Sequence, residues 1–202
     1  MYIPPVFAET DPKKLHAFIE ANSFGVLTSM LQGELFATHL PFLLETGGPR
    51  AVLLAHVARA NPQWQELDGQ NVLAVFPGPH AYVSPSWYES DNVVPTWNYV
   101  AVHAYGICRL MQDAGELHAL LQKMIATYER SMPAPWTLAD AGFLEKMARQ
   151  VVGFRVEVSR LEGKWKLNQN HPRERREKVV QVLSRSPDPD GQEIARLIQE
   201  SL

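Results

Sequence analysis

Short apolar stretches, several of them alternating with polar residues, recur along the chain and predict β-strands. They lie at 24–30, 34–45, 51–58, 71–78, 81–84, 94–109 and 151–163. Short turns containing glycine join the first three stretches, which is typical of an antiparallel meander. Successive short strands of this kind favour a closed antiparallel β-barrel with helices around it over a parallel doubly wound sheet.

Apolar residues at helical spacing predict helices at the start, in the middle and at the end of the chain. These helices lie at about 11–22, 61–67, 113–131 and 143–149, with two more within 172–202. Asp11 and Pro12 supply an N-cap and a first-turn proline for the first helix. We expect a mainly β single domain over 1–202, with the helical segment 172–202 packed on it.

The stretch 94–109 carries an unusual set of side chains for a strand. If it runs unbroken, one face carries Trp97, Tyr99, His103 and Tyr105, and the other carries Asn98, Val100, Val102, Ala104 and Cys108. A half-buried strand normally places aliphatic groups on one face and short polar groups on the other. Large rings with hydrogen-bonding atoms suit a flat ligand as well as they suit a core.

Composition limits the class of protein. The chain has 202 residues, a net charge of −3 and one cysteine. The charge argues against nucleic-acid binding by the whole protein, and a basic run such as Lys164–Lys178 is more often a solvated helix start than a phosphate-facing patch. No apolar stretch reaches the length of about 18 residues that predicts a membrane span. Cys108 cannot form an internal disulfide, so we expect a cytoplasmic protein that does not contact a membrane.

Several motifs that announce a particular chemistry are missing. The sequence has no GxxxxGK[ST] or GxGxxG phosphate loop, no HExxH or Cys/His cluster, and no GxSxG elbow. We therefore expect no metal site and no serine or cysteine hydrolase. Histidine is the side-chain type suited to proton exchange near neutral pH, which makes His39, His56 and His103 candidates, but the sequence does not choose among them, and no catalytic residue is assigned.

Three short segments combine the residue types that a phosphorylated, flat ligand requires. They are Thr38-His39-Leu40-Pro41-Phe42, the segment from His56 to Pro62 that includes Arg59, and Lys166-Leu167-Asn168-Gln169-Asn170. An arginine before a capped helix start makes a good phosphate site. Each segment also has a plain structural explanation, as an edge proline, a surface arginine, or a turn. Together they favour FMN or pyridoxal phosphate, and the pattern does not separate the two.

The chain resembles a known family through several motifs that follow one another almost from end to end. The matching motifs are MYIPPVF (1–7), THLPF (38–42), HVARANPQW (56–64), VFPGPHAYVSPSWY (75–88), VPTWNYVAVHAYG (94–106) and KLNQN (166–170). They resemble the PaiB-type family of FMN-binding negative transcriptional regulators, which adopt the antiparallel FMN-binding split β-barrel of pyridoxamine-phosphate-oxidase-like proteins. The chain departs from the family pattern at Asn168, where a serine is expected.

The resemblance implies a homodimer with FMN bound in the clefts between the subunits. Carried over by motif, Arg59 and His56 become the phosphate-side candidates, and Thr38 to Pro41 becomes the strand beside the flavin. The cofactor-binding residues expected in this way are Thr38, His39, Leu40, Pro41, His56, Val57, Arg59, Asn61, Trp97, Asn98, Tyr99, Lys166, Gln169 and Asn170.

Three functions remain open at this point. The first is a flavin-binding regulator that acts through a partner or a ligand. No helix-turn-helix is evident, so direct contact with DNA is not expected. The second is an FMN-dependent oxidoreductase that acts on a small molecule. The third is a split barrel that binds haem or no cofactor.

Overall fold

The computed structural model describes residues 1–88, 93–137 and 141–202, which divide into two compact units. Unit 1 contains 1–18, 76–103 and 162–202, and unit 2 contains 19–75 and 104–161. Three long strands contribute residues to both units: β6 (Asn71–Val83), β7 (Thr96–Leu110) and β8 (Val151–Lys166). The grouping of 1–202 into one domain stays a prediction.

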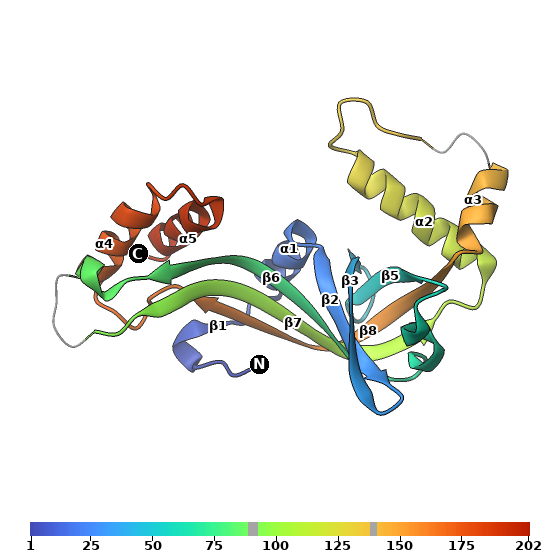
Figure 1. Ribbon diagram of the computed structural model, residues 1–202, viewed down its shortest axis with the longest axis horizontal. Helices are drawn as coiled ribbons and strands as arrows, with labels where there is room; N and C mark the ends of the chain where they lie inside the picture. Colours follow the sequence, from blue (N-terminus) through green and yellow to red (C-terminus); the bar gives the residue numbers. More distant parts are fainter. Residues whose placement is uncertain (89–92, 138–140) are drawn as a thin grey trace. The chain divides into compact units, whose positions relative to one another are not determined.

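The described strands form one eight-stranded sheet (Figure 1). The remaining strands are β1 (Ala8–Glu9), β2 (Phe24–Leu31), β3 (Glu34–Pro41), β4 (Leu43–Glu45) and β5 (Val52–Ala58). The strand order is β3-β2-β6-β7-β8-β5-β4, and β1 pairs with β8. The pairings β1/β8, β2/β3, β2/β6, β4/β5 and β5/β8 are all antiparallel, as the sequence predicts.

The segment 34–45 does not form the middle strand of a meander. It divides at Pro41 and Phe42, so that β3 pairs with β2 whereas β4 pairs with β5. Pro41 has no backbone N–H with which to continue a ladder. Phe42 is buried, and its N–H donates to the carbonyl of Ser23 at 2.8 Å. The predicted three-stranded meander is therefore wrong, and two hairpins lie at opposite edges of the sheet.

The stretches 71–78 and 81–84 form a single strand, β6, although Gly78 and Pro79 predict a break between them. A Cβ atom at Gly78 would lie 2.8 Å from Cε2 of Phe18 and 3.1 Å from the carbonyl oxygen of Val100. Glycine therefore lets the strand pass close to the Phe18 ring, and here it serves packing instead of a turn.

The predicted alternation of β7 is confirmed. Its even-numbered residues from Asn98 to Cys108 are buried, and its odd-numbered residues from Trp97 to Ile107 are exposed or half-buried. The sole cysteine lies on the buried face, where burial raises the pKa of the Cys108 thiol to about 12. Cys108 is therefore an unreactive strand residue, because the thiolate is the reactive form.

The helices agree with the sequence prediction within a few residues. They are α1 (Pro12–Ala21), α2 (Ala114–Glu129), α3 (Ala141–Ala148), α4 (Arg173–Leu183) and α5 (Pro189–Glu200). Asp113 caps α2 by accepting a hydrogen bond from the N–H of Glu116 at 2.9 Å. The predicted helix after Asn61 is a 3-10 turn, η2 (Pro62–Glu66), and two further turns are η1 (Pro5–Phe7) and η3 (Pro85–Tyr88). No helix in the described ranges is long and apolar enough to cross a bilayer.

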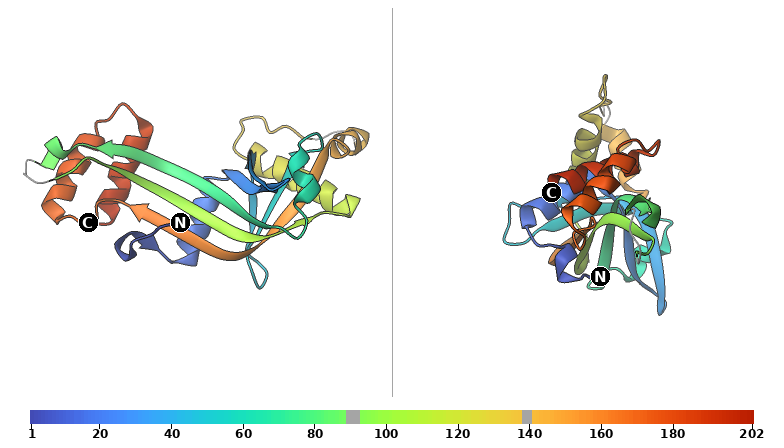
Figure 2. Two further views of the ribbon diagram at one scale, coloured as in Figure 1. Left: turned by 60° about the horizontal axis from the view of Figure 1, so that its bottom comes forward. Right: turned by 90° about the vertical axis from the view of Figure 1, so that its left-hand side faces the viewer.

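In unit 1, α4 and α5 lie side by side over one face of the strands (Figures 1 and 2). The core between them contains Ala81, Val83, Tyr88, Val100, Leu167, Val179, Leu183, Ile194, Ala195 and Ile198. The N-terminal segment lies on the other side of these strands (Figure 1). One face of this part of the sheet is therefore a closed hydrophobic core, whereas Tyr82 and Trp97 on the other face are 45% and 53% exposed.

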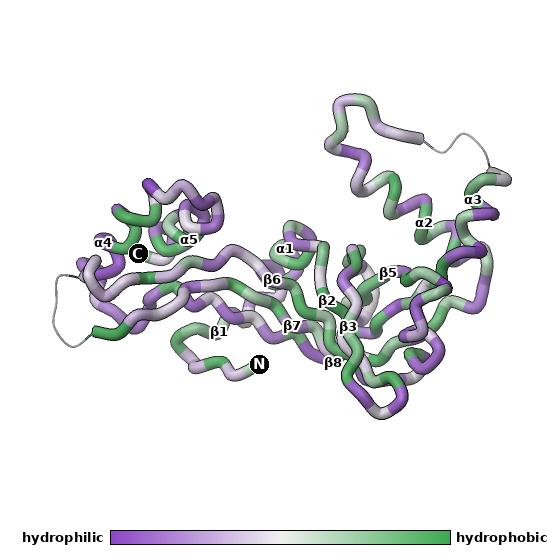
Figure 3. The backbone as a smooth tube through the Cα atoms, viewed as in Figure 1, coloured by the Kyte–Doolittle hydropathy of each residue, from purple (hydrophilic) through white to green (hydrophobic). Residues whose placement is uncertain are grey.

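In unit 2, helix α2 packs its apolar stripe against the hairpin of β4 and β5. Leu120 and Met124 of the helix form a buried cluster with Leu43 and Leu54. Hydrophobic and hydrophilic positions alternate along α2, as its colouring in Figure 3 shows. The stripe predicted from the sequence is thus a packing surface.

Arg176 connects the two C-terminal helices through its buried guanidinium group. The residue is 9% exposed, and Nη1 donates to the carbonyl of Ser201 at 3.1 Å. Nη2 donates to the Ser201 hydroxyl and, at 3.5 Å, to the carbonyl of Ile198. These acceptors lie at the C-terminal end of α5, where carbonyl groups lack helical partners. Arg176 therefore anchors the end of α5 to α4.

We predict that Gly106→Ala destabilises the protein by roughly 1–3 kcal/mol, the usual cost of overpacking a core. A Cβ atom there would overlap the carbonyl oxygen of Glu157 and lie 2.9 Å from its carbonyl carbon, and this backbone cannot rotate away. Gly47→Ala is the control, because a Cβ at Gly47 meets no atom within 4 Å. Urea denaturation of both variants measures the difference, and equal midpoints would contradict the prediction.

We also predict that Arg176→Ala lowers the free energy of unfolding by roughly 1.5–3 kcal/mol, the range for hydrogen bonds to a charged group. Arg173→Ala, on the same helix, removes an exposed ion pair with Glu177. Its effect should stay within about 0.5 kcal/mol. Denaturant unfolding, with α-helical circular dichroism as the signal, compares the two variants. If both variants lose a similar free energy of unfolding, the buried hydrogen bonds of Arg176 do not stabilise the protein more than an exposed ion pair does.

Candidate functional site

The predicted residues Thr38 and Asn61 meet in a hydrogen-bond network inside unit 2. The Thr38 hydroxyl donates to Oε1 of Gln63 at 2.6 Å and accepts from Nδ2 of Asn61 at 2.9 Å. Gln63 is fully buried, and its Nε2 donates to the Ser29 hydroxyl at 2.9 Å. The sequence prediction missed Gln63 and Ser29, because a glutamine after a helix-capping Asn-Pro pair gives no sign of burial. The network satisfies its own members and holds β3 to η2.

Arg59 joins β5 to the segment before β8. Its Nε donates to the carbonyl of Arg149 at 2.9 Å, and its Nη2 donates to the carbonyl of Val151 at 3.0 Å. Its guanidinium carbon lies 5.9 Å from the centre of the Trp64 ring. Two of the three guanidinium nitrogens are thus engaged with backbone carbonyls.

The structure does not bring His56 and Arg59 together as a phosphate clamp. His56 points toward α2, where its Nδ1 lies 3.3 Å from the sulfur of Met124. Burial lowers the pKa of His56, so the ring is neutral at pH 7 and supplies no charge for a phosphate. The neighbouring Val57 is buried in the core.

The remaining predicted residues of unit 2 lie along β3. Thr38, His39, Leu40 and Pro41 pair with Leu27, Val26, Gly25 and Phe24 of β2. His39 is exposed and stacks on Phe24, with ring centres 6.4 Å apart, whereas Leu40 is buried. This part of β3 presents its backbone and the His39 ring, and no cation.

On the open side of the strands in unit 1, aromatic rings and lysines lie together. We call this surface the aromatic–lysine face and define it by His80, Tyr82, Trp97, Tyr99, Lys164 and Lys166. Trp97 is 53% exposed, and its ring centre lies 5.8 Å from that of Tyr82 and 6.0 Å from that of His80. Lys164 places its Nζ 5.0 Å from the centre of the Tyr99 ring. The ring face predicted for 94–109 is therefore present in unit 1.

Lys166 lies at the end of this face beside the start of β7. Its Nζ donates to the carbonyl of Trp97 at 2.8 Å and to the hydroxyl of Thr96. Burial, and after it the charge of Lys164, lowers the pKa of Lys166. The structure thus brings the predicted residues Trp97, Tyr99 and Lys166 together, and it adds Lys164, which the sequence analysis named only as the start of a basic run.

Asn98 lies on the opposite face of β7 and is fully buried. Neither Nδ2 nor Oδ1 has a hydrogen-bond partner within the described parts of the chain. A buried amide without partners is costly, roughly 1–3 kcal/mol for each polar group. Asn98 thus differs from Asn61 and Gln63, whose amide groups have partners among the described residues.

Gln169 closes the turn after β8 with its own side chain. Oε1 accepts from the N–H of Leu167 at 2.7 Å, and Nε2 donates to the carbonyl of Trp165 at 2.6 Å. Asn168 adopts a left-handed conformation, with φ of 61°, that asparagine tolerates better than most residues. Its buried amide donates to the Tyr88 hydroxyl at 2.7 Å. The segment 166–170 thus forms a turn, with Asn170 exposed at its surface.

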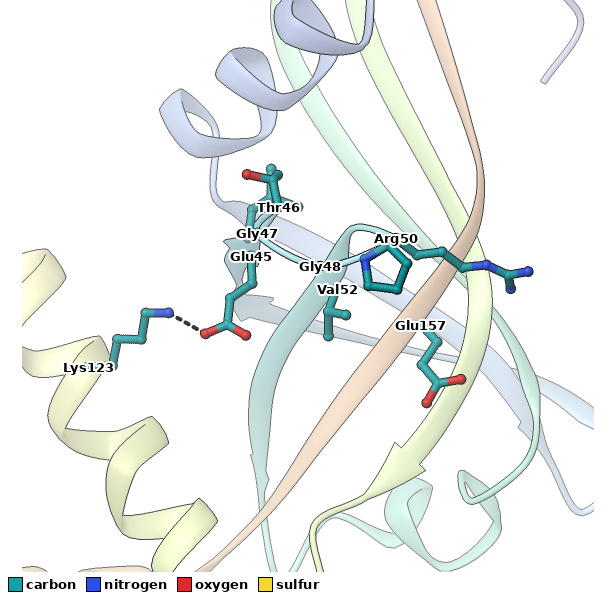
Figure 4. A pocket seen from close by; sticks show the side chains of 10 residues that line it. Glu45, Thr46, Gly47, Gly48, Arg50, Val52, Lys123 and Glu157 are labelled. Atoms are coloured by element: carbon teal, nitrogen blue, oxygen red, sulfur yellow. Dashed lines mark hydrogen bonds and ion pairs between the residues drawn. The ribbon is translucent and has the colours of Figure 1, made fainter.

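A pocket of about 770 Å³ in unit 2 lies between the β4–β5 hairpin, α2 and β8 (Figure 4). Lys123 is bound there by Glu45, and Arg50 points away from this pair (Figure 4). Glu157 adds a second acid, so the two cations and two acids of the lining balance. None of the residues predicted from the sequence line this pocket, and it offers no net positive charge to an anion.

Comparison with known proteins identifies the family. The family described as "Putative FMN-binding domain" matches residues 1–160. The "Protease synthase and sporulation protein PAI 2" of Bacillus subtilis is 36% identical over 205 residues, covering 100% of this chain and 98% of that protein.

Two solved structures are similar in fold at low sequence identity. The flavocytochrome Anf3 from Azotobacter vinelandii is 15% identical with a TM-score of 0.61, over 79% of this chain and 69% of that one. The FAD and heme binding protein from Mycobacterium smegmatis is 12% identical with a TM-score of 0.60, over 79% and 73% of the two chains. The predicted antiparallel split β-barrel is confirmed. The chain belongs to the FMN-binding domain family and is an FMN-binding protein of the PaiB type.

Proposed function

We propose that this protein is a flavin-binding negative transcriptional regulator that acts as a homodimer. Its family supports FMN as the cofactor. The name of the Bacillus subtilis relative refers to protease synthesis and sporulation, and both terms are consistent with control of gene expression. The observation that carries the proposal is the family match together with an open face that suits a flavin.

The aromatic–lysine face of unit 1 has the groups that a flavin requires. Trp97 offers an exposed indole for a flat ring, because offset stacking of aromatic rings is favourable. Lys166 and Lys164 offer positive charge for the phosphate. Gln169 and Asn170 belong to the turn that follows Lys166 in the chain, and we propose that they border this face. Asn98 lies on the other side of β7 and is proposed as a buried polar residue of the strand, not as a direct contact of the ligand.

The predicted residues of unit 2 are proposed in a different role. Thr38, Asn61 and Arg59 use most of their hydrogen-bonding groups to hold their own strands, as described above. We propose that they fix the shape of β3 and β5, so that His39 and the backbone from Leu40 to Pro41 remain available to a ligand. His56 and Val57 are proposed as packing residues of the same strand.

When FMN is bound, it supplies any redox chemistry itself. The residues of this chain bind and orient it and hold water away from the ring. Burial lowers the pKa of His103 on the ring-bearing face of β7, so its imidazole is neutral at pH 7. We therefore propose binding and positioning as the role of these residues and assign none of them to catalysis.

Regulation through a ligand or a protein partner is favoured over direct binding to DNA. The helical part of the basic run does not present a row of free cations, because Arg176 is buried, Arg173 binds Glu177, and Lys178 binds Glu174. Phosphate-backbone binding requires cations that are free to replace counterions.

A homodimer is consistent with the large apolar side chains that the described surface exposes. Leu35 is 79% exposed and Phe24 is 62% exposed, both on the β2–β3 hairpin. Tyr82 and Trp97 are 45% and 53% exposed on unit 1. The rings of Tyr82 and Trp97 lie together, with centres 5.8 Å apart, and exposed apolar groups that lie together commonly mark interaction surfaces.

The proposal predicts that the purified full-length chain binds FMN with one site per chain and has the mass of a dimer. Absorbance spectra and FMN titration measure binding, and light scattering measures mass. Failure to bind FMN would contradict the proposal, and a Soret band would show that haem occupies the protein instead. Turnover of NAD(P)H by the FMN-loaded protein would identify an oxidoreductase, and salt-sensitive retention of DNA would identify a direct repressor.

We further predict that Trp97→Ala weakens binding of FMN and riboflavin alike, by about 3–10-fold, because a ring contact is worth roughly 0.5–1.5 kcal/mol. Trp136→Ala is the matched control: Trp136 is 50% exposed, close to the 53% of Trp97, but lies outside the aromatic–lysine face. Quenching of flavin fluorescence gives both affinities. Equal behaviour of the two variants would remove the ring contact from the proposed site.

A further inference from the structure

Three side chains with nitrogen or sulfur donor atoms meet beneath α2 in unit 2. His56 lies on β5, Met124 lies on α2, and Met111 directly follows β7. The Nδ1 atom of His56 lies 3.3 Å from the sulfur of Met124. Met111 packs against the buried cluster to which Met124 belongs. One imidazole and two thioethers are thus brought together from three separate segments of the chain.

Gly153 leaves the space that Met111 fills beside His56. Gly153 of β8 is the register partner of His56 in the antiparallel pair of β5 and β8. The side-chain positions of two such partners lie on the same face of the sheet, about 4.5–5.5 Å apart. A Cβ atom at Gly153 would lie 2.9 Å from the sulfur of Met111. The Met111 sulfur therefore lies next to the His56 side chain, on the face from which His56 reaches Met124.

The spacing of the His56 and Met124 donors suits a single metal ion. Metal–nitrogen and metal–sulfur bonds in zinc sites are about 2.0 and 2.3 Å long, so two donors at a tetrahedral angle lie roughly 3.5 Å apart. The observed 3.3 Å requires only a small adjustment, and the flexible methionine side chain can make it. Nδ1 of His56 would then hold the ion, and Nε2 would carry the ring proton.

The types of donor select the class of ion. Thioethers are soft donors that favour Cu(I), and imidazole is a common ligand of copper. Zinc in proteins is bound by thiolates, imidazoles and carboxylates, and Mg²⁺ and Ca²⁺ take oxygen ligands. A metal ligand must be a neutral imidazole, and burial lowers the pKa of His56, so the ring is neutral at pH 7. One nitrogen and two thioether sulfurs therefore fit Cu(I).

Hydrophobic packing explains the methionines more readily than it explains His56. Methionine commonly fills gaps in cores, and Met124 lies in one cluster with Leu43, Leu54 and Leu120. An imidazole is a polar group in these surroundings, and its Nδ1 faces the sulfur of Met124. A thioether is a weak acceptor, so this contact compensates little for burial of the ring. A soft metal ion would bind both groups.

We propose that His56, Met111 and Met124 form a binding site for a cuprous ion, Cu(I). The sequence analysis considered clusters of histidine and cysteine, and it missed this site because two of the donors are methionines that are distant from His56 in the chain. An ion held by all three side chains joins β5, α2 and the end of β7. The site requires no flavin, so the inference does not rest on the proposed function.

The test is an anaerobic titration of the full-length protein with Cu(I), in competition with a chromophoric Cu(I) chelator. We expect the wild type to bind one ion per chain. X-ray absorption at the copper edge should then show both nitrogen and sulfur ligands. Bound Cu(I) should also raise the melting temperature, because a ligand of the native state stabilises it. Zn²⁺ at the same concentration should leave the melting temperature unchanged.

Three variants each remove one donor: Met124→Leu, Met111→Leu and His56→Gln. Leucine and methionine have similar volumes, so the two leucine variants preserve the packing of the cluster. We expect each change to weaken Cu(I) binding by at least about 10-fold, since loss of a residue that only supports a metal ligand already costs 10–100-fold. The rise of melting temperature with Cu(I) should shrink in the same variants.

Two further variants serve as controls. Met147→Leu makes the same change at a methionine of α3 that is 46% exposed in unit 2. Cys108→Ala removes the sole thiol of the chain, which is the other soft donor that could take Cu(I). Both variants should bind Cu(I) as the wild type does. Melting temperatures without metal show whether each variant folds.

The inference is overturned if the wild type binds no Cu(I), or if a folded Met124→Leu or Met111→Leu variant binds it unchanged. Loss of binding in Cys108→Ala, with binding retained in the methionine variants, would assign the ion to the thiol and overturn it as well. Equal stabilisation by Zn²⁺ would contradict the assignment to a soft ion. Failure of the proposed function gives a different result, because a protein that binds no flavin still binds Cu(I) through these side chains.

Discussion

The two faces of β7 in unit 1 impose the constraint on which the proposed site depends. One face must remain apolar because α4 and α5 close over it, and this burial holds the C-terminal helices to the strands. The strict alternation of the strand then commits its other residues to the opposite side. Trp97 and Tyr99 are displayed there because Val100 and its buried neighbours are held on the core side. A shift of one residue in β7 would exchange the two sets and remove both the core and the site.

The polar residues of the chain divide into groups that maintain the fold and groups that remain available to a ligand. Gln63 and Arg176 illustrate the first kind, since both are buried and their bonds connect separate elements. Lys166 and Asn170 illustrate the second kind, because Lys166 is only half-buried and Asn170 is exposed. This distinction cannot be made from residue type, since an amide side chain occurs in both groups.

Sequence patterns were sufficient for the elements that depend on local chemistry. Asp113 predicts the start of α2, and the alternation of the two faces of β7 can be read from its sequence. Sequence patterns were misleading where a contact between residues distant in the chain determines the local structure. Gly78 permits close packing of Phe18 and does not form a turn, and Pro41 divides a strand whose two halves pair with different strands. The same limit applied to the site. Arg59 resembled a phosphate ligand because its hydrogen bonds to Arg149 and Val151, about ninety positions away in the chain, cannot be read from the sequence. Lys164 lies in no motif that distinguishes it from an ordinary surface lysine.

The burial of Cys108 affects how well the protein resists oxidation by peroxide. Reduced flavins that meet oxygen can release peroxide, and cysteine thiolates are the side chains that peroxide converts most readily to sulfenic and higher acids. The sole thiol of this chain is fully buried, and its pKa of about 12 keeps it protonated at physiological pH. The protein therefore offers its own cofactor no cysteine to oxidise, and a redox signal in this chain would have to be read from the flavin or from the rings around it.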